Sequence, residues 1–273
     1  MAATIQKVLL AIYRLVHKTG VLQQPWCQTV FLYSYFFYKK HLEDPFRGLV
    51  DRRPDLFKGG HILDIGANIG YTSSLFASSI DPQFKVHSFE PDASNFAMLQ
   101  RFIERDRKGE IIVANCTAVG SSDGAIDFWH NPDHHGDHRV LTPSLKKTGV
   151  PAAQVSSVPV ITIDSYVNAN RIENQIRFVK IDVQGYELQV CKGMLSTMER
   201  NPDLVIALEY APEAMRALGA NPDQLLDFFR ERDWLIYLLD RHGNVSEFSK
   251  RSAASFFASR DYVDLLICKD VMR

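Results

Sequence analysis

The stretch that decides the fold is "HILDIGANIGYTSSLF", residues 61–76. It begins with a short apolar run, passes through a turn of small residues and ends in a helical pattern. An apolar strand followed at once by a helix is typical of the start of a βαβ unit. The turn between them should therefore lie at the carboxyl end of a strand, where open parallel sheets bind their ligands.

Further apolar runs of the strand type alternate with helical patterns along the rest of the chain. These runs are KVHSFEP, IIVANCTAV, RFVKIDV, DLVIALEY, WLIYLLD and YVDLLIC. The alternation predicts a doubly wound, Rossmann-like α/β fold whose mostly parallel sheet is covered on both faces. We expect one domain over residues 59–273, preceded by a helical segment, residues 1–58, that packs on it or caps it.

Two segments lie outside this alternation. An insertion at about residues 124–170 contains the β-type runs AIDFWHN and SVPVITIDSYV, which predict a β-hairpin added to the sheet or capping its edge. Residues 5–16 have apolar side chains at helical spacing, but Lys7 and Arg14 interrupt any run that could cross a bilayer. We expect this amphipathic helix and the aromatic stretch 31–42 to pack on the domain, with weak contact to a membrane surface as the alternative.

Composition and cysteine spacing argue against a nucleic acid partner, a zinc site and a disulfide framework. A net charge of −1 and the lack of a basic stripe argue against a nucleic acid partner. The four cysteines lie far apart without a C-x-x-C pair, so neither a zinc site nor a disulfide framework is indicated. Isolated thiols and the lack of a clear signal peptide predict a cytoplasmic protein.

The turn after the first strand predicts a nucleoside site. Gly66 and Gly70 would let a ligand approach the backbone, but Asn68 stands where the dinucleotide fingerprint has its middle glycine. Asp64 would attract a cationic group such as an amino acid ammonium. Glu90 follows Gly70 by 20 residues, an interval typical of an acid that binds a ribose. One acid for an amino acid tail and one for a ribose together predict S-adenosylmethionine.

Several motifs in this order resemble the FkbM-type S-adenosylmethionine-dependent O-methyltransferases. They are LDIGANIGYTS, FEPDASNFAML, AVGSSDG, TIDSY, VKIDVQGYE and IALEYAPE, and the resemblance extends from about His61 to Cys268. It implies a class I methyltransferase fold with an antiparallel last strand. It also implies methyl transfer to a hydroxyl of a small molecule, sugar, glycolipid or secondary metabolite, without identifying the acceptor.

The resemblance assigns the cofactor site residue by residue. The first-strand motif and the ribose acid correspond to Asp64, Gly66, Asn68, Gly70 and Glu90. Ala118 and Val119, in NCTAVGS, correspond to the loop beside the adenine. Where the family commonly has Glu, in DVEG, this chain has Gln184, so a role that requires a carboxylate there is not carried over.

Asp182, in VKIDVQG, is the leading catalytic candidate, because the end of its strand should lie nearest the methyl-transfer centre. An alcohol attacks a sulfonium methyl only as its own proton leaves. Asp182 would hold the hydroxyl, orient a histidine base or bind a divalent metal. We expect Glu209, which ends the next strand run, on the substrate side, and we interpret Glu187 as structural.

The stretch WHNPDHHGDHRV, residues 129–140, contains four of the nine histidines. A solvated turn is one interpretation, because Asn-Pro and His-Gly-Asp favour turns. Neutral imidazoles also suit a general base or a metal ligand. We predict that His138 is catalytic and that His135 and Arg139 bind substrate, while the use of a divalent metal stays open.

Two other functional classes fit parts of the sequence. A methyltransferase-like binding protein without activity would keep the nucleoside pocket, but it would be free to lose Asp64, Glu90 or Asp182, and all three are present. An NAD-dependent oxidoreductase is less favoured, because the middle glycine of the fingerprint is missing. The sequence does not determine the oligomeric state.

Overall fold

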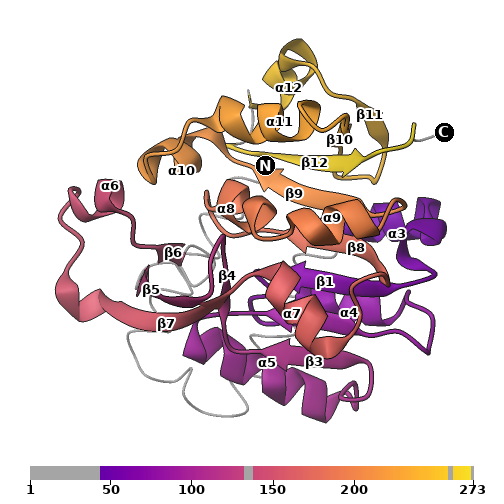
Figure 1. Ribbon diagram of the computed structural model, residues 1–273, viewed down its shortest axis with the longest axis horizontal. Coiled ribbons are helices and arrows are strands. Elements are labelled where there is room, and N and C mark those ends of the chain that lie inside the picture. The colour runs from indigo at the N-terminus through magenta and orange to yellow at the C-terminus, as the bar shows by residue number, and fades with distance from the viewer. Residues whose placement is uncertain (1–43, 132–137, 258–260, 272–273) are drawn as a thin grey trace.

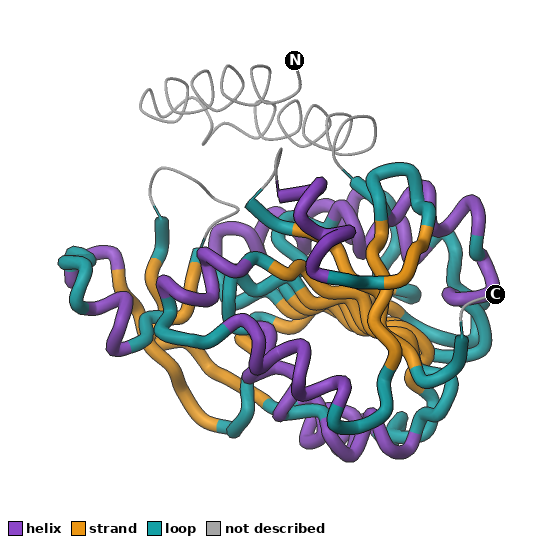
Figure 2. The backbone as a smooth tube through the Cα atoms, turned by 90° about the horizontal axis from the view of Figure 1, so that it is seen from above, coloured by secondary structure: helices purple, strands orange, loops and turns teal. Residues whose placement is uncertain are grey.

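The computed structural model describes residues 44–131, 138–257 and 261–271. Its centre is an eight-stranded sheet with helices on both faces (Figures 1 and 2). In spatial order the strands are β11 (Val245–Glu247), β10 (Leu235–Leu239), β12 (Val263–Cys268), β9 (Val205–Tyr210), β8 (Ile176–Ile181), β1 (His61–Ile65), β2 (Val86–Phe89) and β3 (Ile112–Asn115). Neighbours from β9 to β3 pair in parallel, whereas β12 is antiparallel to β9 and β10. The doubly wound α/β class and the antiparallel last strand are confirmed.

The helices cover the two faces of this sheet. One face is covered by α3 (Phe46–Arg52), the 3-10 helix η3 (Pro54–Phe57), α4 (Tyr71–Ala77) and α5 (Ala93–Arg105). The other is covered by α7 (Ile163–Asn170), α8 (Glu187–Lys192), α9 (Leu195–Arg200), α10 (Pro212–Ala217), α11 (Pro222–Arg230) and α12 (Lys250–Phe257).

Side chains of the central strands alternate between two hydrophobic cores. Ile62 and Phe178 pack in the core under α4 and α5, whereas Leu63 and Val179, the next residue of each strand, pack in the core under α7 to α9. All four are fully buried. Because both faces are covered, these strands are apolar at consecutive positions, which explains the unbroken apolar runs in the sequence.

Helix α5 illustrates how local sequence fixes an element near the site. Asp92 is its N-cap, and its Oδ1 accepts hydrogen bonds from the backbone N–H of Ser94 and Asn95 at 2.9 and 2.8 Å. Leu99 and Phe102, three residues apart, lie on the same buried face against the sheet. The cap thereby holds Asp92 at the carboxyl end of β2.

A second, four-stranded sheet contains the insertion. Its order is β4 (Ala118–Val119), β7 (Val155–Ile161), β5 (Gly124–Trp129) and β6 (Arg139–Val140), and α6 (Pro143–Lys146) and η4 (Ala152–Gln154) lie between β6 and β7. The antiparallel β5–β7 pair confirms the expected hairpin. Of the two expected placements, addition to the main sheet is wrong, because β7 pairs in parallel with β4 in a separate sheet. Figure 1 shows the small sheet on the side toward which β1 points.

Two predicted strand runs divide in the structure. IIVANCTAV breaks after Asn115, whose side-chain amide donates to the carbonyl of Ser88 at 3.1 Å, and its second half forms β4 in the small sheet. SVPVITIDSYV ends as a strand at Ile161, because Thr162 caps α7 by accepting a hydrogen bond from the N–H of Ser165 at 3.1 Å. Strand β11 was not predicted.

The expected N-terminal helices over residues 5–16 and 31–42 lie outside the described residues. The part of the N-terminal segment that is described packs on the main sheet. Phe57 is fully buried, and the centroid of its ring lies 4.6 Å from the ring centroid of Phe178 and 5.5 Å from that of Phe76. Within the described ranges, we find no helix with the length and apolar character needed to cross a bilayer.

Candidate functional site

The carboxyl ends of β8, β1 and β2 lie side by side, since β1 pairs in parallel with both neighbours. The chain leaves β1 toward β2 on one side, and β8 lies on the other side. This is the topological switch point at which doubly wound sheets bind ligands. Three predicted groups meet there, namely the loop after β1, Glu90 directly after β2 and Asp182 directly after β8.

The glycines of the β1 loop are required by packing within the protein. Gly66 has a φ of +78°, and a Cβ there would overlap the carbonyl oxygen of Asp182. Gly70 has a φ of +94°, and a Cβ there would lie 2.6 Å from Cδ1 of Leu99 in α5. The sequence interpretation assigned both glycines to ligand approach, whereas the structure gives each a protein neighbour that only glycine accommodates.

Asn68 adopts a left-handed backbone conformation in the loop after β1. Its φ is +50°, a left-handed value that Asn tolerates better than most residues. Its N–H donates to Oε2 of Glu90 at 2.8 Å. Asn68 therefore allows the tight turn, but it still has a side chain where the dinucleotide fingerprint has a glycine for close approach to a pyrophosphate.

Glu90 has a buried carboxylate with free acceptor capacity on both oxygens. It is 5% exposed, and each of its carboxylate oxygens has one backbone donor, the N–H of Asp92 at 2.9 Å and the N–H of Asn68 at 2.8 Å. Each oxygen keeps a second lone pair, so the carboxylate can accept hydrogen bonds from two hydroxyls, one at each oxygen. Burial raises the pKa of Glu90 to about 7, against the lowering effect of the two backbone donors.

Asp64 is directed into the protein. It is fully buried, and its Oδ2 accepts hydrogen bonds from Thr72 Oγ1 at 2.7 Å and Ser73 Oγ at 2.6 Å. Its Oδ1 lies 3.4 Å from Nζ of Lys180, so the protein itself provides a cation for this carboxylate. The predicted contact of Asp64 with an amino acid ammonium stays a prediction.

Lys180 is a central residue of the site that the sequence interpretation missed. Its side chain is 5% exposed, and Nζ donates to the carbonyl of Gly66 at 2.7 Å. Nζ also lies 3.6 Å from Oδ2 of Asp182, so Lys180 connects β8 to the β1 loop between two acids. A lysine within an apolar strand run was the available signal, because a buried ammonium requires such partners.

Asp182 is accessible, with 36% of its side chain exposed. Its Oδ1 accepts a hydrogen bond from Nε2 of Gln184 at 2.9 Å, and Gln184 has a left-handed φ of +55°. An ionised Glu at that position could not donate. The departure from the family pattern thus supplies a hydrogen-bond donor that holds the Asp182 carboxylate.

Glu187 and Glu209, the remaining acids considered from the sequence, have different surroundings. Glu187 is fully buried, and its Oε1 accepts the N–H groups of Val183 and Gly185 at 3.2 and 3.0 Å, in agreement with a structural role. Burial raises the pKa of Glu187 to about 7. Glu209 is half-buried on β9, in register with Asp264 of β12. Its contact with substrate stays a prediction.

Ala118 and Val119 do not form a loop. They make up β4, pair in parallel with Val160 and Ile161, and are buried. Ala118 packs in the core of the small sheet, and Val119 packs in the core on one face of the main sheet. The expected loop is therefore wrong, because these residues form a strand, while their contact with the adenine stays a prediction. The exposed Cys116 lies in the link between β3 and β4.

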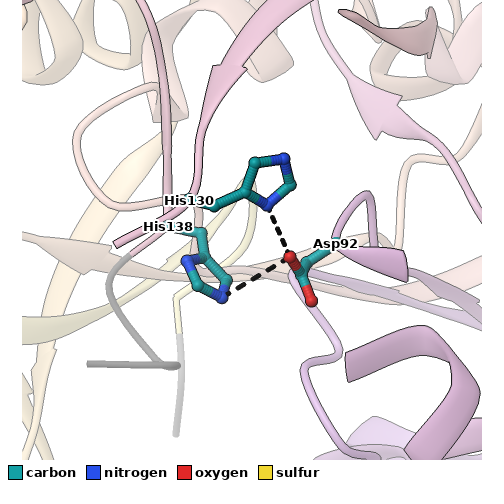
Figure 3. A group of neighbouring side chains, drawn as sticks. All are labelled: Asp92, His130 and His138. Atoms are coloured by element: carbon teal, nitrogen blue, oxygen red, sulfur yellow. Dashed lines mark hydrogen bonds and ion pairs between the residues drawn. The ribbon is translucent and has the colours of Figure 1, made fainter. Parts of the chain in front are cut away.

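Two histidines of the predicted cluster converge on Asp92 (Figure 3). His130, directly after β5, places Nδ1 2.6 Å from Oδ2 of Asp92, and His138 places Nε2 3.6 Å from the same oxygen. Burial would raise the pKa of Asp92, but its backbone donors and the two imidazoles hold it below the ordinary value. His135 lies outside the described residues, and Arg139 is half-buried in β6 opposite Trp129.

The same three side chains offer a donor set for a divalent cation. One atom each of Asp92, His130 and His138 lies within 4.8 Å of the other two. Imidazole and carboxylate are ligands of Zn²⁺ and related ions. Neither Asp92 nor His130 was predicted as a site residue, because only the docking of the small sheet on the N-terminus of α5 brings them together.

Comparison with known proteins finds one family and several methyltransferases. The model of the "Methyltransferase FkbM domain" family matches residues 64–236. The hexuronic acid methyltransferase AglP of Haloferax volcanii is 27% identical over 139 residues, 50% of this chain and 51% of that protein. The chain thus matches about half the length of that relative.

Two solved structures are similar at low identity. A methyltransferase FkbM from Methylobacillus flagellatus is 18% identical with a TM-score of 0.48, covering 85% of this chain and 52% of its own. An O-methyltransferase from Bacillus cereus, in complex with SAH, is 13% identical with a TM-score of 0.43, covering 83% and 82%. Because the family model spans more than half of the sequence, the chain belongs to the FkbM methyltransferase domain family.

Proposed function

We propose that this protein transfers a methyl group from S-adenosylmethionine to an oxygen of a sugar or a sugar-containing small molecule. The observation that carries the proposal is the buried carboxylate of Glu90 at the switch point of a chain that belongs to a methyltransferase family. It is supported by Asp182, an accessible acid directly after β8, which pairs with β1. Glycan or glycolipid acceptors belong to the same class.

Three residues have distinct roles in this proposal. Glu90 accepts hydrogen bonds from the two ribose hydroxyls, and its pKa falls as those donors stabilise the ionised form. Lys180, held by Asp64, fixes the loop after β1 through the carbonyl of Gly66. S-Adenosylmethionine, when bound, supplies the electrophilic methyl group. Asp182 receives the acceptor and aligns its oxygen for in-line attack.

The acceptor class follows from a relative and from chemistry. The similar protein of Haloferax volcanii is named a hexuronic acid methyltransferase. A hexuronic acid offers two kinds of oxygen, hydroxyls and a carboxylate. Methylation of a hydroxyl gives an ether and releases a proton, whereas methylation of a carboxylate gives an ester without proton loss. We favour the hydroxyl, because the site contains imidazoles beside an acid that orients them.

The proposal is tested with purified full-length protein. Calorimetry should detect binding of S-adenosylmethionine and S-adenosylhomocysteine, and NAD is the control ligand. Methyl-labelled S-adenosylmethionine is then incubated with free hexuronic acids, nucleotide-activated hexuronic acids, oligosaccharides that end in hexuronic acid, and the corresponding neutral sugars. Treatment of the product with mild alkali releases methanol from an ester and leaves an ether intact.

The expected result is transfer of an alkali-stable label to a sugar. Binding of NAD without binding of S-adenosylmethionine would contradict the proposal in favour of an oxidoreductase. Cofactor binding without transfer to any acceptor would favour the binding protein. We also expect a cytoplasmic protein, in keeping with the free thiols of Cys116, Cys191 and Cys268.

A further inference from the structure

Asp92, His130 and Ser156 form a hydrogen-bonded chain beside Glu90. Nδ1 of His130 lies 2.6 Å from Oδ2 of Asp92, and Nε2 of His130 lies 2.7 Å from Oγ of Ser156 in β7. The backbone N–H of Asp92 donates to Oε1 of Glu90 at 2.9 Å, so this chain of side chains adjoins the proposed ribose site. An acid, an imidazole and a hydroxyl in this order are the arrangement that makes an imidazole a base.

The hydrogen bonds assign the tautomer of His130. An ionised Asp92 can only accept, so the proton of the neutral imidazole belongs on Nδ1. Nε2 then carries the lone pair and accepts the hydroxyl proton of Ser156. Ser156 is exposed, and 31% of the His130 side chain is exposed. The basic nitrogen is therefore paired with a hydroxyl at the surface of the small sheet.

His138, the base predicted from the sequence, has the opposite arrangement. Its Nδ1 accepts the backbone N–H of Asn131 at 2.9 Å, which places its proton on Nε2, 3.6 Å from Oδ2 of Asp92. Its side chain is only 6% exposed. The basic nitrogen of His138 is thus used by the backbone, and the residue is suited to holding the small sheet on α5.

Resting on the proposed methyl transfer, we propose that His130 is the general base of the reaction and that Asp92 is its positioning residue. The acceptor hydroxyl takes the position now held by the Ser156 hydroxyl, which a rotation about χ1 frees. As the acceptor oxygen bonds to the methyl carbon, the carbon–sulfur bond breaks and its electron pair stays on sulfur. The hydroxyl proton moves to Nε2, Asp92 stabilises the imidazolium, and the proton then passes to solvent.

The same geometry decides between a base and a metal ligand. Metal-bound imidazoles normally donate their second N–H to a partner. His138 accepts a backbone N–H at that second nitrogen, so binding a cation through Nε2 would require loss of the Asn131 hydrogen bond. The neutral, hydrogen-bonded form keeps every contact described above.

The first test measures the tautomer directly. In protein labelled with ¹⁵N-histidine, long-range ¹H–¹⁵N spectra at neutral pH should show His130 protonated at Nδ1 and unprotonated at Nε2, assigned by comparison with His130→Gln. Asp92→Asn keeps the helix cap, because Asn caps as well as Asp. The amide that Asp92→Asn introduces would donate to Nδ1 of His130 and so favour the tautomer with its proton on Nε2. The spectrum reports this change. A wild-type His130 protonated at Nε2 overturns the proposal.

The second test measures single-turnover methyl transfer to the acceptor found in the screen. His130→Gln should lower the rate by about 10²–10⁴-fold, and Asp92→Asn should lower it within the same range. Affinity for S-adenosylhomocysteine and the melting temperature should stay as in the wild type. His242→Gln, an exposed histidine between β10 and β11, is the matched control and should transfer at the wild-type rate.

Each contrary outcome has a separate meaning. An unchanged rate in His130→Gln, an alkali-labile ester as product, or loss of activity on chelation with recovery by Zn²⁺ or Mn²⁺ would overturn the base assignment while methyl transfer stands. A wild-type protein that binds the cofactor and methylates none of the acceptors would contradict the proposed function, and the base assignment would fall with it.

Discussion

The carboxyl end of the main sheet and the small sheet build their polar groups in different ways. At the main sheet, Asp64, Glu90 and Asp182 lie in or directly after parallel strands whose pairing brings the strand ends together. At the small sheet, Asp92 and His130 are 38 residues apart and meet only because one sheet docks on a helix of the other. Groups at parallel strand ends follow from topology, whereas groups across a docked interface follow from packing.

The largest expected effect compares one glycine from each region. Gly66→Ala should prevent stable folding, because the new Cβ would overlap the carbonyl of Asp182 at a left-handed φ. Gly124→Ala, in β5, has a φ of +146° with no neighbour within 4 Å, and it should cost only about 1–3 kcal/mol. Denaturant unfolding measures both. Equal losses would show that the β1 loop is no more tightly packed than the small sheet.

The next comparison uses two lysine–aspartate pairs. Lys180→Met leaves Asp64 buried without its cation and should lower the free energy of unfolding by about 3–5 kcal/mol. Lys146→Met breaks an exposed pair with Asp127 in the small sheet and should cost about 0–1 kcal/mol. Urea titrations at low and high salt measure both changes. A small loss in Lys180→Met would mean that Asp64 does not depend on Lys180 for its charge balance.

Replacement of Glu90 tests its proposed contact with the ribose of the cofactor. Glu90→Gln should weaken binding of S-adenosylhomocysteine by about 1–3 kcal/mol, because one ribose hydroxyl loses its acceptor. Glu187→Gln is the matched control, since both acids are buried and have a pKa of about 7, but Glu187 accepts its hydrogen bonds from Val183 and Gly185 of its own loop. Calorimetry of both variants gives the difference. Equal affinities would remove Glu90 from the cofactor site.

The smallest effect is a dependence of cofactor affinity on pH. Below about pH 7 the free protein carries a protonated Glu90, whereas the ribose hydroxyls favour the ionised form. Binding therefore releases a proton, and affinity should rise toward pH 7 by up to about tenfold per unit and then level off. Calorimetry in buffers of different ionisation enthalpy measures the number of protons released on binding. Glu90→Gln should lose this slope, and a slope that persists would assign it to another group.

The sequence by itself determined the α/β class, the order of the strand runs in the chain and the acids at the strand ends. It did so because apolar runs that are buried on both faces leave a local pattern, and parallel pairing then fixes where their carboxyl ends lie. The match of residues 64–236 to the family model agrees with this prediction.

Only the tertiary structure decided which groups face one another across the small sheet and inside the switch point. It paired Lys180 with two acids, placed Ala118 and Val119 in a strand, and gave Asn68 a left-handed backbone conformation. It also directed His130 and His138 at one carboxylate and placed the backbone N–H of Asn131 at Nδ1 of His138. A hydrogen-bond direction depends on which backbone or side chain lies opposite, and residues distant in the sequence leave no local pattern for that.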